Sequence, residues 1–437
     1  MSKRSKHPYR VHPVSRLEWS GVFDSVEGQR VTVGVDVAKR GMVAAVMDEA
    51  QRVVKTVGWS HPEESDTFLG FVSGLQACSA SVAVAMEPSG VYGDALRWQL
   101  LAAGIDVYRV SPKKSKDMSE IYDGVPSSHD GKSAAIVAVL HSRGTSDPWP
   151  MESDRERELS AALRLLEVFG KQARQNRSRL EALTARHWPE LTSILELSTA
   201  TALELLGAYG SPAAVAADAE GARSLMRRVG GAMLDPQKVE TIVRGASGSK
   251  GVPPIPEETQ VIRALAMEAR RNQLAQKKAQ QRVEELAGAG GATREMAKLV
   301  GKTTAAVLVA GIGDPRNFTS PQALVKAVGL NLREHSSGTK QGGLHITKRG
   351  SGVARLYLWM AVLRLIQSDQ VVQAWYAKKL ERQGGQAKAK AVVALMRKLV
   401  LALWHVARGE DFDATKLFDV RRLVLLDRAG TIRARRA

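Results

Sequence analysis

The stretch RVTVGVDVAKRGMVAAVMDEAQRVVKTVGW, residues 30–59, decides the fold of the first part of the chain. Residues 30–38 alternate valine with mostly polar residues, and residues 41–48 and 52–59 are further apolar runs after short breaks. Such runs are typical of β-strands. Because the three strands lie so close together in sequence, they predict an antiparallel meander.

Helices and strands alternate after this meander. A proline near the start and helical apolar spacing predict a helix over 61–77, and the apolar run 81–87 predicts a buried strand. A helix over 93–104, a strand over 105–110 and a helix over 132–144 follow. Three meander strands followed by strand–helix alternation are typical of an α/β domain with the ribonuclease H-like layout, and not of a plain doubly wound sheet.

Three acidic residues occupy the ends of these elements. Asp36 ends the first strand, Glu87 ends the strand in SVAVAME, and Asp130 opens the last helix. Acids at strand ends of such a sheet can converge on one point, where a divalent cation such as Mg²⁺ or Mn²⁺ offsets their repulsion. Two such ions could clamp a phosphodiester. The pattern therefore predicts a metal-dependent site for phosphoryl transfer.

Each acid also has a purely structural interpretation. Asp36 could be a turn residue, Glu87 could end its strand before Pro88, and Asp130 could cap the helix that it opens. These alternatives stay open for each residue taken singly.

Net charge and amino-acid composition indicate which class of molecule the protein binds. The 437 residues carry a formal net charge of +18, and Cys78 is the single cysteine, which excludes an internal disulfide and a cysteine-based zinc site. Residues 378–437 hold 15 Lys and Arg against 6 Asp and Glu, a net of +9. No apolar run is long enough to span a bilayer. A chain of this kind is expected in a reducing compartment such as the cytoplasm and is expected to bind nucleic acid.

The chain divides into four predicted regions. A basic flexible arm over 1–28 precedes the α/β domain at 29–150, a helical region at 151–292, and a mainly α-helical domain with a basic tail at 293–437. The helical region contains two long amphipathic helices, at 153–188 and 256–288. Such helices suggest an antiparallel coiled coil or a dimer stalk, or else a helical linker without a partner.

The last region opens with a turn between helices. Residues 296–318 have the glycine-punctuated pattern of a degenerate helix–hairpin–helix, whose backbone amides can hold a phosphate. The Gly-Lys-Thr-Thr inside it is not a P-loop, because Met296 stands where the first glycine is required.

A polar, glycine-rich loop follows, with two adjacent serines, Ser336 and Ser337. A serine becomes a nucleophile only with a base or with strong electrostatic help. Basic residues nearby could supply that help to an attack on DNA phosphate, and these are Lys340, Lys348, Arg349 and Arg355, with His345 among them. Most Ser-Gly pairs are ordinary turns, so the residues alone leave both interpretations open.

These motifs resemble those of one family. VGVDVAKRGMVAAVMD, AMEPSGVYGDALRWQLLAAGIDVYRVSP and HDGKSAAIVA are similar to the N-terminal DEDD, RuvC-like domain of IS110-family transposases. Asp36 is followed by the family's short turn, Glu87 lies in its E-x-S-G-x-Y stretch, and Asp130 fits the first acid of D-x-x-D-A. Ser133 stands where the fourth acid belongs, which is a departure from the family pattern.

The resemblance extends to the other end of the chain. GDPRNF, LVKAVGL, REHSSG and ITKRGSGVARLYLWMAV are similar to the C-terminal transposase domain of the same family. By this resemblance the nucleophile is Ser337, with Ser336 as the second candidate. The basic residues would contact phosphate or be structural, and these are Lys340, Lys348, Arg349 and Arg355.

The resemblance implies an activity. Members of the family are recombinases of insertion sequences, guided by an element-encoded non-coding RNA that pairs with donor and target DNA. The acids bind a divalent metal, and the serine forms a covalent phosphoserine link to DNA. Sites are composite between subunits, in a tetramer built from dimers. Two other classes remain: a metal-dependent nuclease or resolvase with a structural serine, and a non-catalytic nucleic-acid-binding relative in which Ser133 marks a decayed metal site.

Overall fold

The computed structural model describes residues 9–125, 129–288, 290–334 and 342–423. The chain separates into two compact units, Met1–Ser153 and Asp154–Ala437. The predicted α/β domain lies in the first unit. The predicted division of the second unit near residue 292 stays a prediction. Within the described part of the chain, no helix is both long enough and apolar enough to cross a bilayer.

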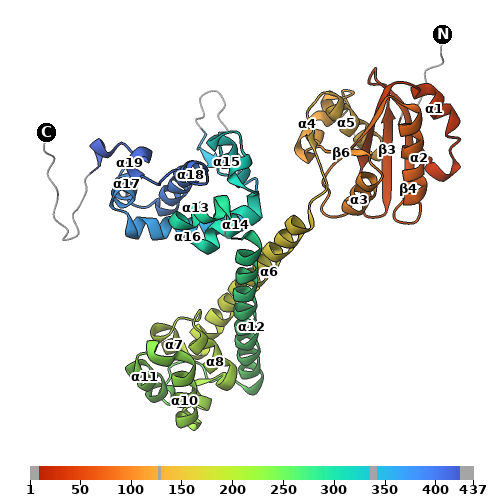
Figure 1. Cartoon of the computed structure of the whole chain (residues 1–437). Coiled ribbons are helices and arrows are strands. Elements are labelled where there is room, and N and C mark those ends of the chain that lie inside the picture. Colours follow the sequence, from red (N-terminus) through yellow and green to blue (C-terminus); the bar gives the residue numbers. More distant parts are fainter. Residues whose placement is uncertain (1–8, 126–128, 289, 335–341, 424–437) are drawn as a thin grey trace. The chain divides into compact units, whose positions relative to one another are not determined.

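A mixed sheet forms the centre of the first unit (Figure 1). Its strands are β1 Val11–Pro13, β2 Arg30–Asp36, β3 Gly41–Met47, β4 Val53–Ser60, β5 Ser81–Met86, β6 Asp106–Arg109 and β7 Asp147–Pro148. They are ordered β1-β4-β3-β2-β5-β6-β7. β2, β3 and β4 are antiparallel neighbours, whereas β2, β5 and β6 run parallel. The meander is confirmed, and the mixed α/β sheet is consistent with a RuvC-like domain.

Helices cover both faces of this sheet. They are α1 Ser20–Val26, α2 Ser65–Cys78, α3 Asp94–Ala102, α4 Pro112–Ile121 and α5 Asp130–Ser142. Alternate residues of β3 separate the two layers: Met42, Ala44 and Val46 pack with α1, α2 and α3, while Val43 and Ala45 pack with α5. The sheet is therefore buried on both sides, which explains why its central strands are almost wholly apolar.

A glycine lets α5 lie directly on β2. A Cβ atom added at Gly34 would stand 2.2 Å from the carbonyl oxygen of Ala134 and 2.4 Å from the amide nitrogen of Ala138. No side chain larger than hydrogen fits at that separation without a shift of backbone. Because Gly34 lies two residues before Asp36 on the same face of the strand, this contact brings the start of α5 toward the end of β2.

The expectation of a flexible arm over residues 1–28 is wrong for residues 9–28. β1 pairs with β4, and α1 buries Val22 and Val26 against the sheet. The backbone oxygen of Tyr9 lies so close to Gly131 that a Cβ there would stand 2.6 Å from it. Apolar side chains between the basic residues anchor this segment, and the charge pattern alone did not reveal them.

Two long helices organise the second unit. α6 spans Asp154–His187 and α12 spans Pro256–Ala287, close to the predicted ranges. Arg155 donates to the carbonyl of Leu286 near one end of the pair, and Arg186 pairs with Glu258 near the other. The helices therefore run antiparallel along each other within one chain. A supercoil and a stalk between subunits stay predictions.

Shorter helices pack at both ends of this pair. Between the long helices lie α7 Pro189–Ile194, α8 Ala200–Tyr209, α9 Pro212–Ala217, α10 Ala219–Gly230 and α11 Pro236–Ala246. After them come α13 Gly291–Val300, α14 Lys302–Ile312, α15 Pro321–Val328, α16 Gly352–Ser368, α17 Gln370–Glu381, α18 Lys388–Val406 and α19 Ala414–Leu417. A short hairpin of β8 Leu332–Arg333 and β9 His345–Ile346 separates α15 from α16. This part of the chain is mainly helical, as predicted.

Candidate functional site

Asp36 and Glu87 stand at the same edge of the sheet. β2 and β5 are parallel neighbours in which Val35 pairs with Met86. Asp36 is therefore the last residue of one strand, and Glu87 directly follows the last residue of the other. Each acid comes two residues after a residue that packs against α5, Gly34 in β2 and Ala85 in β5. Both acids therefore lie on the side of the sheet that α5 covers. The strand order thus brings together two acids that are about 50 residues apart in sequence, as the sequence predicted.

Asp130 is the first residue of α5, and it is not the cap of that helix. His129 occupies the N-cap position, where its ring nitrogen Nδ1 accepts from the backbone N–H of Lys132 at 3.2 Å. The alternative in which Asp130 serves as the N-cap is therefore wrong. Its carboxylate lies in the first turn of α5, where the helix N-terminus carries a partial positive charge.

The pKa of Asp36 is raised by its surroundings, which include the other two acids. Burial, together with the negative charges of Asp130 and Glu87, raises this pKa from an ordinary 3.8 to about 6. None of the three carboxylates forms a hydrogen bond or an ion pair with another residue in the described ranges. Buried or clustered carboxylates usually have such partners. Asp36 and Glu87 are partly buried and Asp130 is exposed, so water solvates part of this negative charge and no described basic side chain neutralises it.

The acids do not form a closed metal cage. Among the described residues, no group of three or more His, Cys, Asp and Glu side chains lies close enough to hold an ion. The chemistry of the donors nevertheless fits, because Mg²⁺ and Mn²⁺ prefer carboxylate oxygens. The mutual repulsion of Asp36, Glu87 and Asp130 is what a divalent cation would relieve. A side-chain rotation toward a common centre is therefore required before these three acids can hold one.

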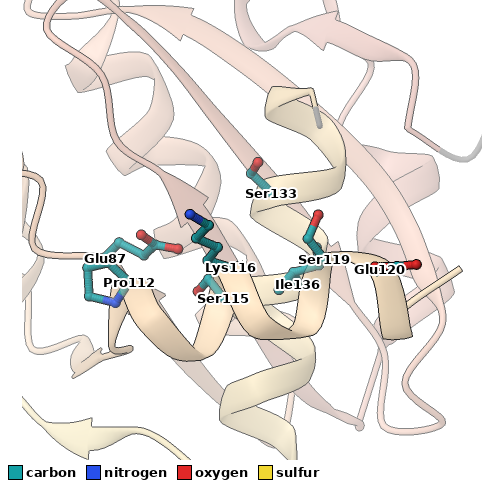
Figure 2. A pocket seen from close by; sticks show the side chains of 8 residues that line it. All are labelled: Glu87, Pro112, Ser115, Lys116, Ser119, Glu120, Ser133 and Ile136. Carbon is teal, nitrogen blue, oxygen red and sulfur yellow. The ribbon is translucent and has the colours of Figure 1, made fainter. Parts of the chain in front are cut away.

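Ser133 lines a pocket beside Glu87 (Figure 2). The pocket has a volume of about 490 Å³ and lies between α4 and α5. Its lining residues are Glu87, Pro112, Ser115, Lys116, Ser119, Glu120, Ser133 and Ile136. Ser133 thus shares a cavity with one of the acids, although it brings no charge. Its role as a metal ligand stays a prediction.

Sequence reasoning missed α4 as a wall of this pocket. The segment SPKKSKDMSE, residues 111–120, carries a serine at the N-cap position and a proline at the first helical position, which is a helix-start signal. Its apolar residues are sparse, and Ser115 and Met118 are the residues that α4 buries. The helix therefore lacks the broad apolar stripe by which the other helices were found.

The proposed nucleophile lies outside the described residues. Ser336, Ser337 and Lys340 fall in the range 335–341, and β8 and β9 flank that range on either side. Their predicted roles therefore stay predictions. The structure describes the segments on either side of this loop, which are β8, β9 and the turn after β9.

Two glycines allow the turn after β9 to pack closely against the end of α15. A Cβ added at Gly329 would stand 2.3 Å from the carbonyl oxygen of Arg349, and one added at Gly350 would stand 2.1 Å from that of Ala327. Lys348, between them, has a left-handed φ of 55° and donates its backbone N–H to the Gly329 carbonyl. The turn after β9 is therefore locked onto the C-terminus of α15.

The predicted basic residues in this region differ in their surroundings. Lys348 and Arg349 are exposed, and neither side chain bonds to another described residue. Arg355 is half-buried, and its Nη1 donates to the carbonyls of Val328 and Gly350 at 3.0 and 3.1 Å. Burial lowers the pKa of Arg355. The structural alternative is thus supported for Arg355, whereas contact with nucleic acid stays a prediction for all three.

The predicted helix–hairpin–helix also stays a prediction. α13 and α14 are joined at Gly301, which has a φ of 83°. Side chains of the chain itself surround this turn: Arg364 donates to the Val300 carbonyl and to Thr304, and Lys302 pairs with Glu284 on α12. A phosphate at this turn would have to compete with these contacts.

Comparisons with known proteins match both ends of the chain. The family model for DEDD transposases of IS110, described as Transposase, matches residues 33–189. The model described as Transposase IS116/IS110/IS902 family matches residues 297–377. The first range contains Asp36, Glu87 and Asp130, and the second contains the hairpin with the proposed serine.

Two relatives are similar to the chain. A protein of Streptomyces coelicolor named "Insertion element IS110 uncharacterized 43.6 kDa protein" is 23% identical over 338 residues, which cover 72% of this chain and 79% of the relative. A protein of Coxiella burnetii named "Transposase for insertion sequence element IS1111A" is 32% identical over 116 residues, which cover 26% of this chain and 31% of the relative.

Proposed function

Because the chain belongs to the IS110 family of transposases, enzymes that act on DNA, we propose that it excises and inserts an insertion sequence with two groups of residues. The first group is the acid triad, defined as Asp36, Glu87 and Asp130. The second is the serine loop, defined as the segment between β8 and β9. Cutting and rejoining would proceed through a covalent link between the protein and DNA.

The acid triad carries this proposal. Its three carboxylates come from the ends of β2 and β5 and the start of α5, they lack partners among the described residues, and their charges raise the pKa of Asp36. A fold rarely keeps uncompensated charge of this kind without a functional reason. We assign to the triad the binding of Mg²⁺ or Mn²⁺, which when bound would supply electrostatic stabilisation of a phosphodiester under attack.

The serine loop would supply the nucleophile. The Ser337 hydroxyl oxygen would bond to phosphorus while the bond from phosphorus to one sugar oxygen breaks. The hydroxyl proton would pass to that leaving oxygen, which ends as a sugar hydroxyl. Lys348 and Arg349, whose backbone is held by the Gly329 and Gly350 contacts and whose side chains are exposed, would neutralise charge on the phosphate. Ser336 is the second candidate for the nucleophile.

The proposed partners are DNA and RNA. The net charge of +18 suits a protein that holds long polyanions. We propose that donor and target DNA are selected by an element-encoded non-coding RNA, that several copies of the chain assemble as a dimer or tetramer, and that the enzyme works at the bacterial nucleoid. A discrete, element-derived RNA among nucleic acids that co-purify with the protein would support guidance. Random cellular RNA in its place would contradict it.

A denaturing gel tests the covalent step. Wild-type protein incubated with labelled DNA carrying the element ends should yield an adduct that survives denaturation, and Ser337→Ala should yield none. The matched control is Ser336→Ala, which should keep the adduct if Ser337 is the nucleophile. DNA cleavage without any adduct would instead support the nuclease alternative with a structural serine.

An excision assay tests the metal site. Asp36→Ala should abolish excision of the element from a reporter plasmid while leaving DNA binding in place. If this variant recombines at the wild-type rate, the acid triad is not used. If neither wild-type nor variant protein cleaves DNA, the non-catalytic alternative holds.

A further inference from the structure

Two exposed aromatic side chains follow Glu87 closely in the chain. Tyr92 and Trp98 are each 47% exposed, and every other aromatic side chain in the described ranges is buried or half-buried. Val91, beside Tyr92, is 63% exposed. The Tyr92 hydroxyl bonds to no described residue. A single exposed tyrosine is ordinary, so its position decides whether it has a partner.

Two turns fix the backbone that carries Val91 and Tyr92. The Tyr92 N–H donates to the Ser89 carbonyl at 3.3 Å, and the Asp94 N–H donates to the Val91 carbonyl at 3.2 Å. Gly90 has a left-handed φ of 62°, a conformation that favours glycine. The segment is therefore an ordered turn that presents two large side chains to solvent.

This turn packs against the ends of β2 and β5. A Cβ added at Gly93 would stand 3.2 Å from the Cε atom of Met86 and 3.3 Å from the Cγ1 atom of Val37. Met86 is the residue before one triad acid, and Val37 is the residue after another. Tyr92, next to Gly93 in the chain, therefore lies at the edge of the sheet that carries the acid triad.

The turn between β2 and β3 adds positive charge at the same edge, because β2 and β5 are parallel neighbours. Lys39 and Arg40 are exposed, and neither side chain bonds to a described residue. Asp94, the acid that follows the aromatic turn, pairs with Arg97. An aromatic ring beside cations is the combination by which proteins hold unpaired nucleotides, since the ring stacks on a base and the cations attract the backbone.

We propose that Tyr92 stacks on a nucleobase turned out of the duplex beside the phosphate at the acid triad, while Lys39 and Arg40 contact the backbone of that strand. The inference rests on the proposed function, because the triad must receive a phosphodiester for the ring to have a base next to it. Turning a base out of a duplex costs free energy. The site therefore prefers DNA that is already unpaired at the cleavage point over intact duplex.

Two DNAs that differ at one base pair test this preference. Both copy the element end, and in one of them the base beside the cleavage point faces an abasic site. With Ca²⁺ in place of Mg²⁺, full-length wild-type protein should bind the unpaired DNA more tightly. Tyr92→Ala should bind it about tenfold more weakly, as for the loss of one base stack, and Tyr92→Phe should bind like wild type. Equal affinity of wild type and Tyr92→Ala would overturn the proposal.

Trp98 supplies the matched control. It is as exposed as Tyr92 but lies on α3, which returns the chain to the opposite edge of the sheet before β6. Trp98→Ala should keep the wild-type preference for the unpaired base. Since Tyr92 is exposed, Tyr92→Ala should keep the wild-type melting temperature. The same loss of preference in both variants would contradict the assignment to Tyr92.

A fluorescent adenine analogue, aminopurine, reports the stack directly when it is the unpaired base. Its fluorescence falls when it stacks on an aromatic ring. Wild type and Tyr92→Phe should quench it in the complex, and Tyr92→Ala should not. Equal fluorescence in the complexes of wild type and Tyr92→Ala would overturn the stack.

Salt dependence tests the backbone contacts. Lys39→Ala and Arg40→Ala should each make the slope of log affinity against log salt concentration shallower by about 1. Tyr92→Ala removes no charge and should keep the wild-type slope. Wild-type slopes in both charge variants would overturn these contacts.

Sedimentation without DNA distinguishes a base from the other occupant of such a surface, a second copy of the chain. Wild type and Tyr92→Ala should assemble alike. Weaker assembly of Tyr92→Ala, with unchanged affinity for DNA, would overturn the proposal. These readouts need no turnover, so their failure is distinguishable from failure of the proposed function, which Asp36→Ala and the adduct gel test separately.

Discussion

At the scale of single residues, two aspartates at strand ends have opposite surroundings, and one of them belongs to the proposed metal site. Asp48 follows β3, is 6% exposed, and bonds to the backbone and guanidinium of Arg52 at 2.8 and 2.9 Å. Asp36 ends β2 without such a partner, and its pKa is raised to about 6. Asp48 stabilises its turn, whereas ionised Asp36 opposes folding of the metal-free protein.

Replacing each aspartate by asparagine should therefore have opposite effects on stability. At pH 7.5 without metal, Asp36→Asn should raise the free energy of unfolding by about 1 kcal/mol, because it removes uncompensated charge. Asp48→Asn should lower it by about 1–3 kcal/mol, because a charged hydrogen bond is lost. Urea unfolding in a chelator measures both, and destabilisation by Asp36→Asn would contradict the assignment.

Position 133 permits a gain-of-function test. Ser133→Asp supplies a fourth carboxylate one turn from Asp130, on the side of α5 that shares a pocket with Glu87. It should lower the Mg²⁺ concentration for half-maximal stabilisation about tenfold, because more carboxylates bind the cation more tightly. An unchanged metal dependence would place Ser133 outside the metal site.

At the scale of elements, close backbone contacts position the site. Gly34 lets α5 lie on β2, and the glycines at 329 and 350 lock the turn after β9 onto α15. Each contact brings together residues far apart in sequence. Each fixes an element that carries a proposed functional group, either Asp130 or the serine loop.

Gly34→Ala should push α5 away from β2. With a Cβ 2.2 Å from the Ala134 carbonyl, the variant should lose about 1–3 kcal/mol of unfolding free energy and much of its metal affinity, because Asp130 moves. Gly41→Ala is the control, since nothing lies within 4 Å of a Cβ there. If both variants bind metal equally, the Gly34 contact does not position the triad.

Gly350→Ala should disturb the base of the serine loop. Its φ of 129° and the 2.1 Å approach to the Ala327 carbonyl exclude a Cβ without a backbone shift, so adduct formation should fall at least tenfold. At Gly352 a Cβ would meet only the Arg355 guanidinium, at 3.8 Å, so Gly352→Ala is the control. Normal adduct yield from Gly350→Ala would show that the loop does not depend on this lock.

The sequence predicted elements with strong periodicity and missed those without it. The helices α6 and α12 agree with their predicted ranges to within one residue at each end, because long amphipathic patterns are informative. The strand β1 has three residues, and α4 buries few apolar side chains. Such elements are stabilised by tertiary contacts that periodicity does not encode. The positions of the three acids at the ends of these elements were predictable from strand order, but the close approach of α5 at Gly34 was not.

At the scale of the whole molecule, the net charge and the family matches both indicate a protein that acts on nucleic acid. The net charge of +18 suits prolonged contact with nucleic acid. Each of the two matched family regions carries one of the proposed functional groups. Under the proposed function, the acid triad and the serine loop would act in the same reaction, so the chain would need both regions.

Metal binding by the acid triad tests the central claim most directly. The raised pKa of Asp36 means that its contribution to stability is present below pH 3.8 and is lost as the pH rises to about 6. A divalent cation competes with this proton, so Mn²⁺ should bind weakly at pH 5 and tightly at pH 7.5. Calorimetric titration of the full-length protein should show this rise for wild type and no binding for Asp36→Asn combined with Glu87→Gln. Equal binding by wild type and the double variant at pH 7.5 would contradict the account.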